Sequence, residues 1–159
     1  MFPAKGPEIL QPPTPEQLTA AFAAAGKPVP SFLKDSVQPA AQPGDQPIGT
    51  RSLMAALTST FYTAYESLTK DRVSWFEANA TNTTNPYDVY VDTLSGDPDL
   101  FVFSPMRWSG TRLQLIGYSI ADPGLDEQVG SFYAKKFGTG RYIVAVYAYS
   151  NCRYRVGYD

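Results

Sequence analysis

Prolines and aromatic residues occupy opposite parts of this chain. Ten of the 14 prolines lie in residues 1–49, whereas 19 of the 22 aromatic residues lie in residues 50–159. Because proline lacks a backbone N–H and disfavours both helix interiors and paired strands, the first part is poorly suited to forming a core. The second part carries the large side chains that fill one. The sequence therefore predicts an N-terminal arm, residues 1–49, and one folded domain, residues 50–159.

One short helix is predicted within the arm. Thr14 is a suitable N-cap, Pro15 would occupy the first helical position, and Gln17 can complete a capping box. Gly26 follows as a C-terminal stop, so the helix should cover residues 15–25. A helix of about three turns with a narrow apolar stripe is marginal alone in water. We therefore expect it to lie on another surface.

The rest of the arm should be extended. Residues 27–47, KPVPSFLKDSVQPAAQPGDQP, contain prolines that disfavour both helix and ladder pairing. This composition is also typical of a disordered tail or a linker. We favour an arm that lies across a partner or across its own domain. Its anchors would be the large apolar side chains Phe2, Ile9, Leu10, Leu18, Phe22, Phe32 and Leu33.

Short runs of β-branched and aromatic residues dominate the domain beyond residue 70, and turn-forming clusters such as TNTTNP and SGDP separate them. Residues 50–69 are ambiguous, and we expect a helical or irregular lead-in to about Thr58, then a strand. Seven or eight short strands without intervening helices predict an all-β fold, an antiparallel jelly-roll-like β-sandwich. The seven clearest runs are residues 72–80, 87–94, 99–103, 111–120, 131–137, 141–149 and 152–158.

Alternation of side chains assigns faces to two of these strands. In CRYRVGY, residues 152–158, tyrosine and valine alternate with arginine, as in a half-buried strand. In RYIVAVYAY, residues 141–149, both faces are apolar. Its outer face should therefore be covered by the arm or should bind a partner, which adds Tyr147 and Tyr149 to the predicted contact residues.

Composition excludes several functions. The chain has no histidine, which removes Ser-His and Cys-His nucleophile pairs and the commonest zinc ligand. A net charge of −2 offers no field to attract nucleic acid, and no stretch approaches the roughly 20 apolar residues that span a bilayer. We expect a chain that is not an enzyme, binds no nucleic acid and does not insert into membranes.

The compartment is inferred from the N-terminus and the cysteine content. Residues 1–13 lack the pattern of a secretion signal, and Cys152 is the only cysteine, so no intrachain disulfide can form. The expected location is the cytoplasm or a large particle such as a virion.

The stretch SGDPDLFVF, residues 95–103, contains the candidate metal ligands. Asp97 and Asp99 flank Pro98 directly before an apolar run, which fits a catalytic acid pair, a calcium site or a turn that starts a strand. The proline favours the turn. No cofactor is expected, with calcium at Asp97 and Asp99 as the alternative. Trp108, in the turn SPMRWSG, is expected to be exposed and available for contacts.

Two stretches resemble the bacterial pre-peptidase C-terminal (PPC) domain family. GDPDLFVF, residues 96–103, is similar to the D-x-D-L motif of the family, and GTGRYIVAVYAYSNCRYRVGYD, residues 138–159, is similar to its closing hairpin. DRVSWF, residues 71–76, is similar to an early D-x-Y-x-F strand, and Glu127 to a carboxylate that precedes a middle strand. Over residues 60–159, the resemblance implies a non-catalytic jelly-roll-like sandwich that serves as an accessory or binding module. Some relatives bind calcium, collagen or carbohydrate.

These observations favour a structural or accessory subunit that docks through its arm onto a larger protein assembly, for example as a decoration, cement or linker protein. The arm composition, the strand that is apolar on both faces and the lack of catalytic groups motivate this hypothesis. The alternative is a module that binds a glycan or a matrix protein, assisted by calcium. In that case Trp108 and loop carboxylates would face the ligand.

Overall fold

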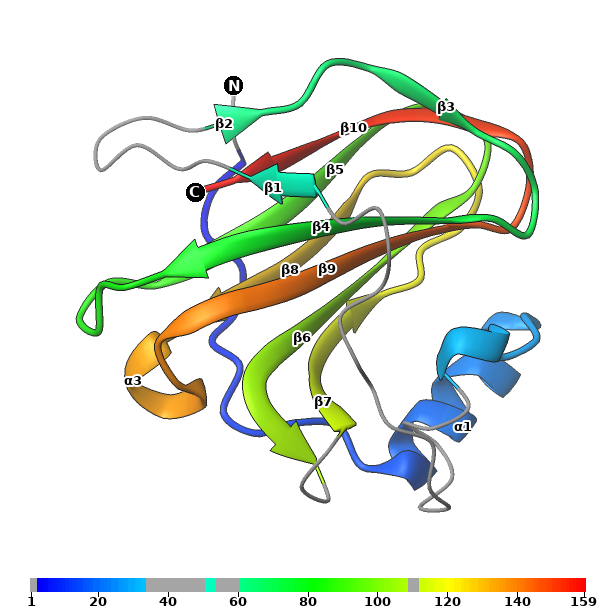
Figure 1. Ribbon diagram of the computed structural model, residues 1–159. Coiled ribbons are helices and arrows are strands. Elements are labelled where there is room, and N and C mark those ends of the chain that lie inside the picture. The colour runs from blue at the N-terminus through cyan, green and yellow to red at the C-terminus, as the bar shows by residue number, and fades with distance from the viewer. Residues whose placement is uncertain (1–2, 34–50, 54–60, 109–111) are drawn as a thin grey trace.

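Two β-sheets pack face to face as a sandwich (Figure 1). The computed structural model describes residues 3–33, 51–53, 61–108 and 112–159, and for residues 51–53, 61, 107, 108 and 112 it describes the backbone alone. Phe2 and residues 54–58 of the predicted lead-in lie outside this part of the chain. The described part of that lead-in, residues 51–53, is a strand where a helical or irregular segment was predicted, because it pairs with β4 (Val73–Ala80).

The first sheet has the strand order β1-β4-β9-β6-β7, and the second has the order β2-β10-β5-β8, with β3 also paired to β10. Every described strand pair except β1 with β4 is antiparallel, which confirms the predicted all-β sandwich. The strands are β1 (Arg51–Leu53), β2 (Phe61–Tyr62), β3 (Glu66–Leu68), β4 (Val73–Ala80), β5 (Tyr87–Ser95), β6 (Pro98–Trp108), β7 (Arg112–Ser119), β8 (Glu127–Phe132), β9 (Gly140–Ala148) and β10 (Cys152–Tyr158).

The strand predicted at residues 131–137 is wrong in its second half. β8 begins earlier, at Glu127, and ends at Phe132, and α3 (Ala134–Phe137) follows as one helical turn. Ala134 and Phe137, three residues apart, are both buried, whereas the two lysines between them are exposed. This spacing belongs to a helix, and a strand would have placed those two positions on opposite faces.

The core between the sheets is made of β-branched, aromatic and small side chains from both inner faces. Tyr154, Val156 and Tyr158 of β10 lie in this core, and the arginines between them point outward, as the alternation predicted. The buried tyrosine hydroxyls have partners: that of Tyr158 donates to the Asn79 carbonyl at 2.9 Å. Other core members include Phe76, Val89, Val91, Leu100, Val102, Ile116, Phe132, Phe137, Tyr142, Val144 and Val146.

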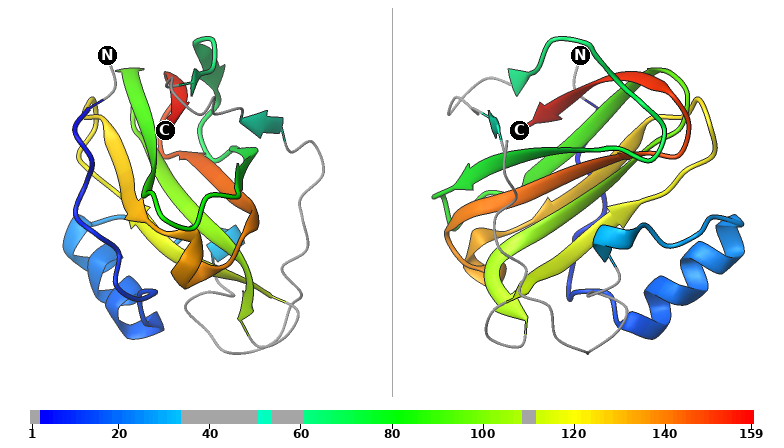
Figure 2. Two further views of the ribbon diagram at one scale, coloured as in Figure 1. Left: turned by 90° about the vertical axis from the view of Figure 1, so that its left-hand side faces the viewer. Right: turned by 45° about the vertical axis from the view of Figure 1, so that its right-hand side comes forward.

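The outer face of the first sheet is covered by the arm of the same chain. Helix α1 (Pro15–Ala25) and the 3-10 turn η1 (Ser31–Leu33) lie against it, outside the strand layers (Figure 2). Both faces of β9 are therefore buried, and the arm of the same chain covers the outer one. The second cluster consists of Leu18, Phe22 and Leu33 from the arm with Phe101, Phe103, Leu115, Ile143 and Ala145 from the sheet.

Local signals in the sequence set the ends of α1. The Thr14 hydroxyl accepts from the Gln17 N–H, and the Gln17 side chain accepts from the Thr14 N–H, which forms the expected capping box. At the other end Gly26 has φ +67°, and Gly26 and Lys27 donate their N–H groups to the carbonyls of Ala23 and Phe22. This is a Schellman motif. No helix in the described ranges is long and apolar enough to cross a membrane.

Residues 4–9 hold the start of the arm against the second sheet. Ile9 and Pro7 exchange backbone hydrogen bonds with Ser131 of β8, both at 2.7 Å. The fully buried carboxylate of Asp88 accepts from the Gly6 N–H at 2.9 Å and from the Gln128 side-chain amide at 2.8 Å. The arm thus crosses from one sheet to the other along the side of the sandwich (Figure 2).

We predict that Phe22→Ala destabilises the fold substantially. The Phe22 side chain is 1% exposed and its ring stacks on that of Phe101 at 6.2 Å between centroids. Truncating a buried phenylalanine costs about 3–5 kcal/mol in the free energy of unfolding. Chemical denaturation of Phe22→Ala, with the exposed Ala20→Ser on the same helix as a control, checks this. Equal stability of the two variants would show that α1 does not contribute to the fold.

Candidate functional site

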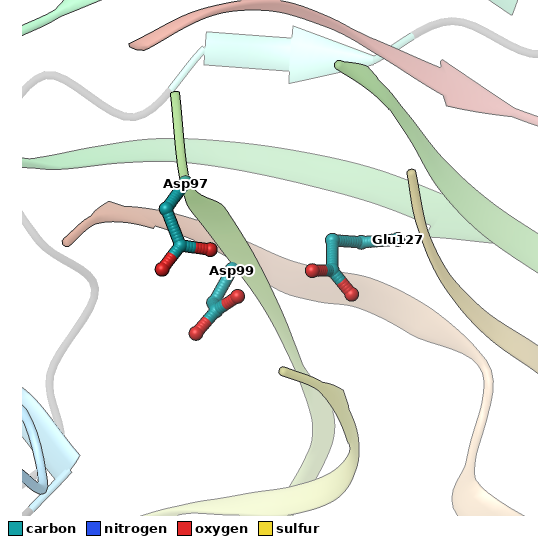
Figure 3. A group of neighbouring side chains, drawn as sticks. All are labelled: Asp97, Asp99 and Glu127. Carbon is teal, nitrogen blue, oxygen red and sulfur yellow. The ribbon is translucent and has the colours of Figure 1, made fainter. Parts of the chain in front are cut away.

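Three acidic side chains converge at one corner of the sandwich: Asp97, Asp99 and Glu127 (Figure 3). They are 6%, 0% and 1% exposed, and each offers a carboxylate oxygen that lies within 4.8 Å of the other two. Asp97 and Asp99 stand at the start of β6, and Glu127 is the first residue of β8. Three acids buried together require a positive charge, a proton or a strong set of hydrogen-bond donors nearby.

The backbone before β6 makes a tight corner that presents the two aspartates. Gly96 has φ +80°, and a Cβ atom there would lie 2.2 Å from the carbonyl oxygen of Asn151, so only glycine fits. Pro98 begins β6, where its missing N–H is tolerated. Asp97 lies at the corner itself and Asp99 one residue inside the strand. The pattern Asp-Pro-Asp thus serves the turn and also directs two carboxylates to one place.

The positive charge comes from Lys27 of the arm. Its ammonium nitrogen lies 2.8 Å from Asp99 Oδ2 and 3.1 Å from each carboxylate oxygen of Asp97. It also donates to the Ala121 carbonyl at 2.9 Å. The Lys27 side chain is only 10% exposed. Asp99 is therefore joined to a residue 72 positions earlier in the chain.

Two features position Lys27. It follows Gly26 in the Schellman motif, so the end of α1 fixes its backbone. The Tyr149 ring lies against the ammonium group, 4.9 Å from the nitrogen to the ring centroid. The Tyr149 hydroxyl also donates to the Pro28 carbonyl at 2.7 Å. The backbone is thus fixed before Lys27 by the Schellman motif and after it by the hydrogen bond to Pro28.

Burial and charge shift the pKa values of the cluster. Burial raises the pKa of Asp99 to about 8, against the hydrogen bond from Lys27 that favours the ionised form. Burial also raises the pKa of Glu127, although the Ser119 hydroxyl and the Ala121 N–H both donate to its carboxylate. For Lys27, burial alone would lower the pKa, but the bonds and charges of Asp99 and Asp97 outweigh it and raise the pKa.

Calcium does not fit this cluster while Lys27 occupies it. The three carboxyl groups are hard oxygen donors, and Oδ1 of Asp99 accepts no hydrogen bond from any described group. The ammonium nitrogen nevertheless lies within bonding distance of both aspartates, where a cation would bind. Calcium at Asp97 and Asp99 stays a prediction from the sequence, and it requires that Lys27 move away.

The other residues predicted to contact a partner are dispersed. Leu18, Phe22 and Leu33 are buried within the chain, and Leu10 is 64% exposed. Phe2 and the side chain of Trp108 lie outside the described part. The remaining four, Ile9, Phe32, Tyr147 and Tyr149, are partly buried against the two core clusters.

Sequence analysis missed Lys27 and Asp88. Lys27 is the only basic residue between Gly6 and Leu33 and directly follows the predicted helix stop, which marks it as unusual. No neighbouring residue in the sequence indicates that Lys27 pairs with Asp97 and Asp99. Asp88 lies within a strand-forming run, where an acidic residue is normally exposed, and only the arm in place makes it a buried acceptor.

No protein-family model matches this sequence, and no curated protein is significantly similar to it. Among solved structures, the chain is similar to the pre-peptidase C-terminal domain of a collagenase from Bacillus anthracis, with 14% identity, a TM-score of 0.48, and coverage of 73% of this chain and 100% of that one. It is also similar to a periplasmic inhibitor of g-type lysozyme from Aeromonas hydrophila, with 16% identity, a TM-score of 0.45, and coverage of 69% and 94%. The strand pairing of this chain confirms the predicted β-sandwich, and these two likenesses establish nothing further.

Replacing Lys27 should change how stability depends on pH. In Lys27→Met the buried Asp99 and Glu127 lose their cation, and their pKa values, already raised in the folded chain, rise further. A raised pKa in the folded state stabilises the protein below the unfolded pKa of about 4, and this stability is lost as the pH rises. The unfolding free energy of Lys27→Met should therefore fall more steeply from about pH 4 to 8 than that of the wild type.

The exposed lysine Lys136 on α3 supplies a matched control. Lys136→Met should follow the wild-type pH curve in the same denaturation series. Parallel curves for Lys27→Met and the wild type would show that the ammonium group does not compensate the cluster.

Calcium should distinguish the same variant from the wild type. Lys27→Met leaves three convergent carboxyl groups without an internal cation, so calcium should raise its melting temperature and a chelator should reverse the rise. The wild type should show no change, because Lys27 holds the site. A wild-type protein stabilised by calcium would restore the sequence prediction and would show that the ammonium group yields to the metal.

Proposed function

We propose that this chain is a non-catalytic protein-binding module, an accessory subunit of a larger assembly, and that its binding surface is the outer face of the second sheet. The observation that carries this proposal is that the two outer faces of the sandwich differ. The arm covers the outer face of the first sheet. The outer face of the second sheet presents a group of tyrosine and charged side chains, which we call the Arg155 face: Tyr62, Tyr65, Tyr90, Asp92, Asp126 and Arg155.

The Arg155 face is held together by its own interactions. The Arg155 guanidinium group lies over the rings of Tyr62 and Tyr65, 4.1 and 4.9 Å from their centroids, and donates to Asp92 at 2.8 Å. The Tyr65 hydroxyl donates to the same carboxylate at 2.7 Å. These contacts fix the side chains before any partner arrives, which lowers the entropic cost of binding.

The composition of this face fits a protein partner. Tyrosine and arginine are among the residues most enriched at energetically important positions of protein interfaces. Two exposed leucines, Leu94 at 56% and Leu125 at 55%, flank in sequence the hydrogen bond from the Thr93 N–H to Asp126. α1 lies on the first sheet and α3 at one end of the sandwich, so neither described helix covers the Arg155 face (Figure 1).

Docking through the apolar anchors of the arm is less compatible with the fold. Leu18, Phe22 and Leu33 are at most 1% exposed, and releasing them would also expose Phe101 and Ile143 of the first sheet. At about 25 cal/mol per Å² of apolar surface, a partner would have to bury an equal area to compensate. We therefore place the contact on the surface of the folded sandwich with its arm in place.

A glycan ligand has less support. Sugar stacking needs open aromatic faces, and one face of both Tyr62 and Tyr65 is occupied by Arg155. The protein partner is the reading that the Arg155 face favours.

Three variants test the proposal. Tyr65→Ser and Leu94→Ser alter the Arg155 face and its margin, and the exposed Leu10→Ser is the matched change on the arm. Tagged proteins recovered from their native cells would be compared by quantitative mass spectrometry for one reproducible set of partners. Because an interface residue of this kind contributes about 1–2 kcal/mol, recovery should fall about tenfold for the first two variants.

Leu10→Ser should retain its partners. If Leu10→Ser loses them and Leu94→Ser does not, the arm binds the partner and the proposed face is wrong. Binding to a glycan array that Tyr65→Ser abolishes, with no protein partner, would replace the protein hypothesis. Deleting the arm is not a clean test, because the deletion also uncovers the first sheet.

A further inference from the structure

The Lys27 cluster, which consists of Lys27, Asp97, Asp99 and Glu127, contains three carboxyl groups, whereas an ion pair requires only one. One ammonium group is enclosed by Asp97, Asp99 and Glu127, all nearly or fully buried, and it joins two segments that are far apart in the sequence. A simple salt bridge of this kind contributes little to stability once desolvation is included. The arrangement instead matches what a condensation between an amine and a carboxylic acid needs.

We propose that Lys27 and Asp99 join in an intramolecular isopeptide bond, with Glu127 carrying protons between the reacting groups. The product would be a covalent link between the arm and strand β6. This self-modification is independent of the protein-binding role proposed above. The ammonium–carboxylate contacts of the site, and the pH and calcium predictions drawn from them, describe the chain before the bond forms.

The nucleophilic nitrogen of Lys27 lies beside the carboxyl group that it would attack. Lys27 Nζ lies 2.8 Å from Asp99 Oδ2, and the carbon that it would attack is bonded directly to that oxygen. Tyr149 and the end of α1 restrict the movement of the lysine. Fixing two reacting groups in contact raises their effective concentration by many orders of magnitude over free solution, up to about 10⁵–10⁸ M.

Asp99, and not Asp97, is the carboxyl group suited to react. Asp99 is fully buried, and its Oδ1 accepts no hydrogen bond from the described groups. Asp97 holds the amine at the same 3.1 Å distance with both of its oxygens and is slightly exposed. Asp97 thus serves as a support for Lys27, whereas Oδ1 of Asp99 receives no hydrogen bond from the described N–H and O–H groups. A buried, poorly solvated carboxyl group is the one that takes a proton and becomes an electrophile.

A group that can carry protons lies beside the reacting atoms. Glu127 offers an oxygen within 4.8 Å of those of Asp97 and Asp99. The Ser119 hydroxyl and the Ala121 N–H, the latter at 2.9 Å, hold its carboxylate in place. The burial that excludes water also keeps the proton within the cluster and opposes hydrolysis of the product.

The chemical balance needs no other reactant. A proton passes from the ammonium group to the carboxyl groups, and the neutral amine of Lys27 attacks Cγ of Asp99. The Nζ–Cγ bond forms and a Cγ–O bond breaks. The departing oxygen leaves as water with two hydrogens that were on the ammonium group, moved through Glu127. An ammonium and a carboxylate thus become one amide and one water, with no oxidation or reduction.

Mass spectrometry tests this directly. The purified full-length chain, denatured, should be lighter than its sequence by the mass of one water molecule. Trypsin cannot cleave between Lys27 and Pro28, so digestion should yield residues 6–34 joined to residues 73–107. Fragmentation of this branched peptide should place the link between Lys27 and Asp99.

Three variants control the assignment. Lys27→Arg keeps a cation but lacks the nucleophilic amine, so it should show the full sequence mass. Glu127→Gln should form the link at least about a hundredfold more slowly, as expected when a general acid-base group is removed. Asp97→Asn should still lose one water. Circular dichroism would confirm that each variant is folded.

Several results would overturn the proposal. A wild-type chain that keeps its full mass after long incubation near neutral pH has no such bond. Loss of water that persists in Lys27→Arg would come from cyclisation at an aspartate instead. A link to Asp97, or a covalent dimer, would show that the assigned intramolecular Asp99 bond is wrong.

Discussion

The burial of the outer face of the first sheet under α1 is the constraint on which the rest of the structure depends. β9 is apolar on both faces, so the sheet that contains it cannot leave either face in water. α1 in turn is too short to be stable alone. Each supplies the surface that the other lacks, and Phe22 against Phe101 lies where they meet. The proline-rich arm is thus part of the folded unit and not an appendage of it.

The position of the charged cluster follows from that packing. Because the Schellman motif ends α1 at Gly26, the next residue is directed at the corner that begins β6. The end of α1 directs the ammonium group to that corner, and the tight turn at Gly96 directs the two aspartates to it. Glu127 reaches the same point because β8, in the opposite sheet, starts at that corner. Four residues from three separate segments are thus brought together by a helix end, a strand beginning in each sheet, and one aromatic ring.

The features that sequence could predict are those with a local cause. Thr14, Gln17 and Gly26 mark a helix within a few residues of one another, and its observed range, 15–25, is the expected one. The alternation in β10 likewise assigned its inner and outer faces. Sequence failed where the cause is distant or the element is short. α3 has four residues, too few for a period to show, and Lys27 meets Asp99 only through the topology of the sandwich. The Arg155 face was missed because its tyrosines 62 and 65 lie in the ambiguous segment 50–69.

The order of the strands affects how the chain can fold during synthesis. β9 and β10, the last two strands to leave the ribosome, are interior strands of the first and second sheets, with neighbours on both sides. Neither sheet can therefore be completed until β10 has emerged. The arm is made before the strands that it covers, so it has no completed surface to lie on until then. For that interval its apolar side chains and the unpaired strands are exposed together, the condition under which non-local β-proteins fold slowly and aggregate.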